Sequence, residues 1–315
     1  MTQKRWTLAT LIALGGTASA DVGEKPAIDA GESISVESRS MRGVAEDYLV
    51  MPSGGELAAQ MKFITADPML GGQALKFTDL ALFGLSGRWS LFSKLELSAQ
   101  VDLLPKQPSY SNEKPWQSAG AGLRSPLGHH TALTLSGAGG HLLSHEGMWT
   151  REALAIEWKK PISKEWLSFD VQGGVDGLGI TAPDSRDSAF LTEVSATTST
   201  LFREPSGHWG AWVGIAYTVP VQHSGSDPTT GLAIDPQPRL DFHAGTVLSI
   251  VKEWDLFADF AVIDRGDLSN PATRLPILDG GFDQKQIVFG VIRHIEGSPK
   301  TSDYGGGDAI EVGSR

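Results

Sequence analysis

The chain of 315 residues contains no cysteine, and this absence excludes several kinds of site. Without a thiol there is no disulfide, no thiolate metal ligand and no cysteine nucleophile. There is also no cysteine to carry an N-terminal lipid anchor. A disulfide-stapled secreted fold and a cysteine-dependent enzyme are therefore excluded.

Basic residues are scarce relative to acidic ones. The chain has 26 Lys and Arg against 37 Asp and Glu, which gives a formal net charge of −11. Proteins that bind nucleic acid need a basic surface to neutralise the phosphates. A nucleic-acid partner is therefore not expected.

Long apolar runs are missing beyond the N-terminus. After Ala20 no window of about 18 consecutive apolar residues occurs, so no transmembrane helix is predicted. One short apolar run, from Trp6 to Leu14, follows Lys4 and Arg5 and is followed by small residues up to Ala20. This order of basic, apolar and small residues is typical of a secretory signal peptide, which we predict at residues 1–20.

Glycine is abundant, at 37 residues or about 12% of the chain against roughly 7% in average proteins, and this disfavours a helical fold. Residues 21–53 are rich in Gly, Pro, Ser and acids without a sustained period, and we predict a flexible periplasmic segment there. Residues 297–315 are predicted to be a disordered polar tail. The intervening region, 54–296, is the predicted folded domain.

Within 54–296 apolar and polar residues alternate with a period of two, which is the pattern of half-exposed β-strands. In the segment 94–104, for example, the odd positions are apolar while Glu96 and Asp102 lie among the even ones. All 17 prolines fall outside the predicted strands, as expected of strands that are hydrogen-bonded on both sides. We predict twelve strands, at 56–65, 78–90, 94–104, 116–125, 131–142, 149–159, 166–178, 188–203, 207–219, 239–251, 254–264 and 286–295.

The predicted connections alternate between long and short, with one tie of two six-residue connections in the middle. Alternating connection lengths, an even strand count and period-two strands are together typical of a bacterial outer-membrane barrel. A soluble antiparallel sandwich also has period-two strands, so the period alone does not separate the two classes.

The tryptophan positions favour the membrane barrel. Trp89, Trp158, Trp209 and Trp254 fall at the ends with short connections and on the apolar face of their strands. Aromatic rings concentrate at the headgroup boundary of a bilayer, so we predict that these four form an aromatic girdle. Trp166 is predicted at the same end but on the polar face.

On these patterns, the region from about Ser53 to Ile295 resembles a bacterial outer-membrane β-barrel of the porin-like type with about twelve strands. The resemblance implies an all-β fold, namely a transmembrane antiparallel up-and-down β-barrel with both termini in the periplasm. It also implies contact with outer-membrane lipid and lipopolysaccharide, and insertion by the barrel assembly machinery. The last predicted strand departs from this family in one respect, because it ends on Ile295 rather than on an aromatic residue.

The polar face of the strands is expected to line the barrel lumen. It carries six bases and ten acids, and this surplus of acids predicts a mild preference for cations if the lumen is open. The predicted lumen-lining residues are Lys62, Arg88, Arg124, Arg151, Lys159 and Arg239, then Glu56, Glu96, Asp102, Glu157, Asp170, Asp176, Glu193, Asp241, Asp255 and Asp259, and also His243.

Two functions remain open for such a barrel. In one, the lumen is a narrow hydrated passage for small solutes; in the other, its charges form a closed network and the outer loops act in structural or adhesive roles. A barrel of twelve strands lies between barrels that side chains fill and barrels that hold a channel. A third function, an outer-membrane hydrolase, is not expected, because His141 and Ser144 fall on opposite faces. No motif predicts a metal or a cofactor.

Overall fold

The computed structural model describes residues 53–67, 80–92, 94–103, 116–141, 148–163, 166–181, 188–225, 236–251, 253–264 and 283–295. The predicted signal peptide, the predicted N-terminal segment apart from Ser53, and the predicted C-terminal tail lie outside these residues.

Twelve β-strands make up the fold, so the predicted all-β class and strand count are confirmed. In chain order they are β1 (Gly55–Asp67), β2 (Leu80–Phe92), β3 (Leu95–Leu103), β4 (Trp116–Pro126), β5 (Thr131–His141), β6 (Met148–Ser163), β7 (Leu167–Thr181), β8 (Ser188–Arg203), β9 (Trp209–Gly225), β10 (Arg239–Val251), β11 (Trp254–Asp264) and β12 (Asp283–Ile295). Every predicted strand overlaps one of these. The described part of the chain has no helix that is long and apolar enough to cross a membrane.

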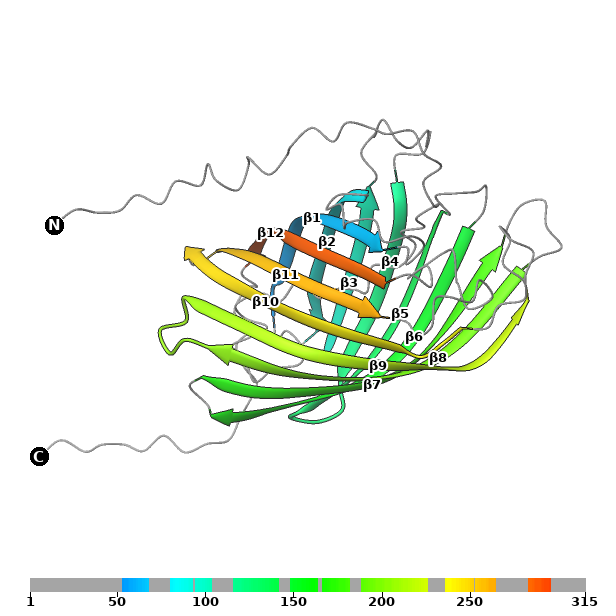
Figure 1. Cartoon of the computed structure of the whole chain (residues 1–315). Coiled ribbons are helices and arrows are strands. Elements are labelled where there is room, and N and C mark those ends of the chain that lie inside the picture. The colour runs from blue at the N-terminus through cyan, green and yellow to red at the C-terminus, as the bar shows by residue number, and fades with distance from the viewer. Residues whose placement is uncertain are drawn as a thin grey trace, which may run out of the picture.

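The strands form one closed antiparallel barrel in which each strand pairs with its neighbours in the chain (Figure 1). β1 closes the barrel on β12, with a register that runs from Gly55 opposite Ile295 to Asp67 opposite Asp283. We call this junction the seam. Closure pairs both edges of every strand, which removes the unpaired backbone groups that hydrocarbon does not tolerate.

The connections between strands differ in length between the two ends of the barrel. The five connections at one end, the short-turn end, are five residues or fewer, and the six at the other end, the long-loop end, are six or more. The tie in the predicted lengths disappears because β6 extends to Ser163, which leaves only three residues between it and the start of β7 at Leu167. The chain therefore has the full alternation of an up-and-down barrel.

The prediction that no proline lies within a strand is wrong at three positions. Pro126, Pro161 and Pro220 lie in β4, β6 and β9. All three lie beyond the last residue that pairs with one of the two neighbouring strands. Proline has no amide hydrogen to donate, and these positions have one side without a ladder partner.

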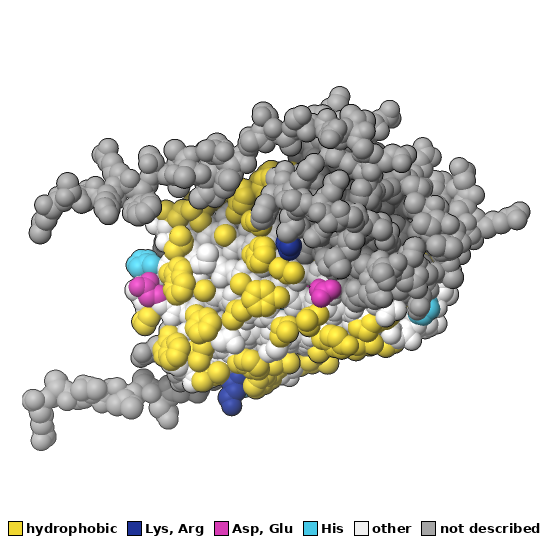
Figure 2. All heavy atoms as spheres, in the orientation of Figure 1, with side chains coloured by type: hydrophobic (Ala, Val, Ile, Leu, Met, Phe, Trp, Pro, Cys, Tyr) yellow, Lys and Arg dark blue, Asp and Glu magenta, His cyan; other side chains and the backbone are white. Residues whose placement is uncertain are grey.

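The exterior of the barrel is apolar. Large side chains alternate outward along each strand, as on β9, where Val213, Ile215 and Tyr217 are 38%, 44% and 51% exposed. Figure 2 shows hydrophobic side chains spread over the described part of the visible barrel wall, with few charged ones among them. An apolar surface of this extent needs lipid as its solvent, so the protein is a transmembrane barrel of the bacterial outer membrane.

The interior is polar along part of the wall and apolar along the rest, which the sequence analysis did not foresee. One buried apolar cluster consists of residues from β6, β7 and β8 toward the long-loop end. A larger one consists of residues from β8, β9, β10, β11, β12 and β1. The members are Trp149, Leu178, Ile180, Ala189 and Leu191 in the first, and Ala58, Leu201, Trp212, Val247, Phe257, Val288 and Ile292 in the second. These clusters narrow the space inside the barrel.

A charge placed on the lipid-facing side is expected to destabilise the barrel. Leu154 of β6 points outward and is 43% exposed, whereas its neighbour Ala155 lines the interior. We expect Leu154→Arg to lower the unfolding free energy in lipid by about 2–4 kcal/mol. Ala155→Arg, the matched lumen variant, should cost much less because its charge meets water. Equal losses in a urea titration in liposomes would argue against the membrane orientation.

Candidate functional site in the barrel lumen

A cavity of about 460 Å³ lies inside the barrel. All twelve strands contribute to its lining. The lining includes Glu56, the second residue of β1 at the short-turn end, and Trp149, the second residue of β6 at the long-loop end. The cavity therefore extends over most of the length of the strands.

Most of the charged residues predicted for the lumen lie on this lining. These are the six bases Lys62, Arg88, Arg124, Arg151, Lys159 and Arg239, the seven acids Glu56, Glu96, Asp102, Glu157, Asp176, Asp241 and Asp259, and His243. The remaining three predicted residues, Asp170, Glu193 and Asp255, are buried but are not part of the lining. The acid surplus along the cavity is therefore one charge rather than four.

A chain of charged side chains crosses the seam at the short-turn end. Nε2 of His294 lies 2.8 Å from an oxygen of Asp255, and Nδ1 lies 3.2 Å from an oxygen of Glu56. Arg88 then lies 2.5 Å from Glu56 and 3.7 Å from Glu96. These five residues, which we call the seam network, connect β11, β12, β1, β2 and β3.

His294 was missed by the sequence analysis, which counted only one histidine in the lumen. The signal was present, because His294 has the same parity as Gln286 and Val288, whose side chains are buried on β12.

Bases elsewhere on the lining also contact acids. Lys62 lies 3.0 Å from Asp102, which accepts a second hydrogen bond from Ser118 at 3.2 Å. Lys62 on β1 reaches Asp102 on β3 across β2, where Gly84 lies opposite Asp102. A Cβ atom at Gly84 would stand 2.9 Å from an oxygen of Asp102, so a side chain there would crowd the ion pair.

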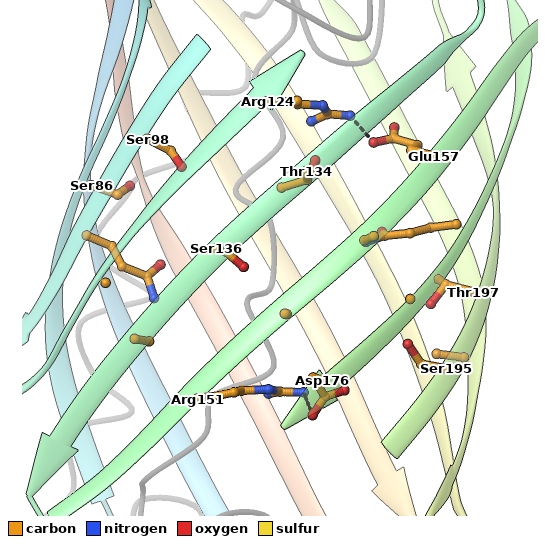
Figure 3. Close-up of a pocket in the computed structure, with 18 of the residues that line it drawn as sticks. Ser86, Ser98, Arg124, Thr134, Ser136, Arg151, Glu157, Asp176, Ser195 and Thr197 are labelled. Atoms are coloured by element: carbon orange, nitrogen blue, oxygen red, sulfur yellow. Dashed lines mark hydrogen bonds and ion pairs between the residues drawn. The ribbon is translucent and has the colours of Figure 1, made fainter. Parts of the chain in front are cut away.

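Three further ion pairs follow the same pattern. Arg124 contacts Glu157, and Arg151 lies 3.0 Å from Asp176 (Figure 3). On β10, Arg239 lies 3.0 Å from Asp241, two residues along the same face of the strand. Lys159 lies directly opposite Asp170 in the register of β6 and β7.

Neutral polar side chains occupy the wall between these ion pairs. Figure 3 shows Thr134 and Ser136 between the Arg124–Glu157 pair and the Arg151–Asp176 pair, with Ser86 and Ser98 to one side of them and Ser195 and Thr197 to the other. We call the set the hydroxyl belt, and it consists of Ser86, Ser98, Thr134, Ser136, Ser195 and Thr197, which all line the cavity. The sequence analysis missed the belt because it counted only the charges on the inward face, although serine and threonine at the same parity were visible.

His243 also points inward and is half-buried. Its Nε2 lies 3.1 Å from Oγ of Ser199, on β8. The contact crosses β9 at Gly214, where a Cβ atom would stand 2.2 Å from Nε2. The glycine therefore leaves the room that this contact requires.

The four tryptophans of the predicted girdle lie at the short-turn end with their side chains outward. Trp158, Trp209 and Trp254 are 39%, 43% and 39% exposed, and Trp89 is partly exposed opposite Gly55. Arg293 stacks over the ring of Trp254, with 5.7 Å between its guanidinium carbon and the ring centroid.

The expectation for Trp166 was wrong. The strand β7 begins one residue later, at Leu167, so Trp166 lies in the preceding turn. There its side chain is 50% exposed rather than directed into the lumen.

The residue types that commonly bind metals or catalyse hydrolysis are scattered over the described part of the barrel. Among the described residues, no group of three or more His, Asp or Glu side chains is arranged to hold a metal ion. His141 is the last residue of β5, while Ser144 lies outside the described residues.

Comparison with known proteins shows similarity to solved structures alone. No protein-family model matches the chain, and no curated protein sequence matches it. An outer membrane channel from Pseudomonas putida F1 is 13% identical and matches 79% of this chain and 98% of its own, with a TM-score of 0.49. The translocator domain of the autotransporter NalP from Neisseria meningitidis is 10% identical and matches 78% and 90%, also with a TM-score of 0.49. The KdgM porin in complex with disordered oligogalacturonate is 8% identical and matches 76% and 98%, with a TM-score of 0.41.

Proposed function

We propose that the protein forms a narrow porin-like passage for small hydrophilic solutes across the bacterial outer membrane. The observation that carries this proposal is the cavity inside the barrel, whose lining carries charged and hydroxyl side chains and reaches from Glu56 at one end of the barrel to Trp149 at the other. A passage for hydrophilic solutes needs polar groups along its wall, because polar solutes are not solvated by lipid. The apolar exterior would contact lipid and lipopolysaccharide, and the barrel assembly machinery would insert the closed barrel.

The two apolar clusters support a narrow passage rather than a wide one. Trp212 and Phe257 face inward, are each 3% exposed and belong to the same buried cluster, so their rings fill part of the interior. Twelve strands enclose less space than the sixteen or more of the large porins. The free space is therefore confined to part of the cross-section, and small solutes are the expected cargo.

A closed structural or adhesive barrel is the second candidate. The ion pairs on the lumen wall favour this candidate, because holding the strands in place is a sufficient role for buried charges that are paired. The two candidates differ in one measurable property, which is whether the barrel conducts.

Single-channel recording in a planar bilayer tests the proposal. The purified full-length protein is expected to give discrete conductance steps in KCl. Ser136→Trp, which fills the lumen, should lower each step by roughly twofold or more. Leu135→Trp is the matched control, since Leu135 points outward and is 55% exposed, and its steps should equal those of the unmodified protein. A silent membrane, together with no efflux of glucose from proteoliposomes that contain the protein, would favour the closed barrel.

A further inference from the structure

The charges on the lumen wall compensate each other locally. Five of the six bases on the cavity lining have an acid within 4 Å, namely Lys62, Arg88, Arg124, Arg151 and Arg239. The sixth, Lys159, lies opposite Asp170. The six bases face seven acids along the lining, so no stretch of wall carries a ring of one sign.

This pairing disfavours ions of both signs. A passage selects cations or anions when uncompensated charges of the opposite sign replace part of the hydration shell of the ion. In a narrow passage with compensated walls, an ion loses hydration without gaining a counter-charge, and that loss is costly. The mild cation preference expected from ten acids against six bases is therefore not supported by the charges that reach the cavity.

The hydroxyl belt favours a different class of solute. Each serine and threonine hydroxyl can both donate and accept a hydrogen bond. Ser98 of β3 and Ser136 of β5 both lie opposite Gly122 of β4, the strand between them, and Thr134 precedes Ser136 on the inward face of β5. Ser195 and Thr197 of β8 also border the cavity (Figure 3). Such a wall can exchange hydrogen bonds with a hydroxylated solute in place of those that the solute made with water.

We propose that the solutes selected by the passage are small, uncharged, hydrogen-bonding molecules such as monosaccharides and other polyols. This inference rests on the proposed passage and names its substrate class. The ion pairs reject charged molecules of the same size, and the hydroxyl belt solvates the neutral ones.

Efflux from proteoliposomes with three solutes of similar size tests the inference. Glucose is neutral, gluconate is an anion and glucosamine is a cation at neutral pH. Glucose is expected to leave liposomes that contain the full-length protein roughly tenfold faster than either charged solute. In a KCl gradient the reversal potential should correspond to permeabilities of K⁺ and Cl⁻ within about twofold of each other.

A charge cycle on the Arg151–Asp176 pair tests the cause. Arg151→Gln leaves Asp176 without its base and should shift the reversal potential toward cations, while Asp176→Asn should shift it toward anions. The double variant restores neutrality and should return to the original value. Glu152→Gln is the matched control, because Glu152 is the exposed, outward neighbour of Arg151, and it should change nothing.

A second pair of variants changes the belt and leaves every charged residue in place. Thr134→Val and Ser136→Ala are expected to slow glucose efflux severalfold while the reversal potential stays constant. Heat-modifiable migration on a gel verifies that each variant is folded.

The outcomes separate this inference from the proposed function. Conductance with strong selectivity for one sign of ion, or efflux of gluconate or glucosamine at the rate of glucose, would overturn the substrate class and keep the passage. Folded protein that passes no solute and gives no conductance steps would overturn the passage itself.

Discussion

Replacing His294 with alanine is expected to lower the free energy of unfolding by about 3–5 kcal/mol, because the change leaves two buried carboxylates without their shared base. Asp255 and Glu56 lie 2.8 Å and 3.2 Å from the imidazole and are 1% and 4% exposed. Without the ring they would repel each other across the seam at the short-turn end. Arg88 would remain to compensate Glu56, so the loss falls mainly on Asp255.

Urea titration in detergent micelles, followed by tryptophan fluorescence and by heat-modifiable migration, measures this loss. Arg293→Ala is the matched control, because Arg293 is the outward neighbour of His294 and stacks on Trp254. That variant should lose only about 0.5–1 kcal/mol. His294→Gln retains a donor for one carboxylate and should fall between the two. If His294→Ala and Arg293→Ala lost the same stability, the seam network would have no special role.

Replacing Gly290 with alanine is expected to prevent normal closure of the barrel. Gly290 lies in β12 opposite Gln60 of β1. A Cβ atom there would stand 2.3 Å from the backbone oxygen of Ala59 and 2.9 Å from Cα of Gln60. Both contacts are with backbone, which cannot move without breaking the ladder that closes the barrel, so we expect little or no heat-modifiable protein after refolding into detergent.

Gly173→Ala is the matched control for this experiment. No atom lies within 4 Å of the position that its Cβ would take, on the exterior of β7. Its unfolding free energy should change by no more than about 0.5 kcal/mol. If Gly290→Ala refolded with the same yield of heat-modifiable protein and the same unfolding midpoint as Gly173→Ala, the seam would accommodate a side chain there without loss of stability, and the prediction would be wrong.

Both predictions concern the seam for the same physical reason. β1 and β12 are the first and last strands of the chain, so the loop that must close before they pair is the longest in the molecule. Interactions that form only on closure, such as the His294–Glu56 contact and the fit of Gly290 against the backbone of β1, therefore act on the step with the greatest entropic cost.

The strands themselves were predictable from the sequence because side chains in a pleated strand alternate between two faces. On β3 the predicted inward residues Glu96 and Asp102 are buried, while Ala99, on the opposite face, is exposed. On β10 Asp241 is buried and Leu240 and Phe242 are each 45% exposed. Alternation of this kind depends only on positions within one strand, so one segment of sequence contains all the information.

Contacts between strands were not predictable in the same way. Lys62 contacts Asp102 across β2, and His294 contacts Glu56 across the seam. Many other charged residues also lie on inward faces, so parity alone does not identify these partners. Which base meets which acid depends on the register of several ladders at once. The apolar cluster of Val247, Trp212 and Phe257 likewise depends on the register of three strands, β9, β10 and β11.

The sequence alone therefore determined the number of strands, the alternation of short and long connections, and which side chains face lipid and which face inward, because each of these follows from a local period or spacing. Only the tertiary structure decided how much of the interior is filled, which charges compensate each other and which hydroxyls border the remaining space. Those properties depend on distances between residues that are remote in the chain, and closing the barrel is what sets these distances.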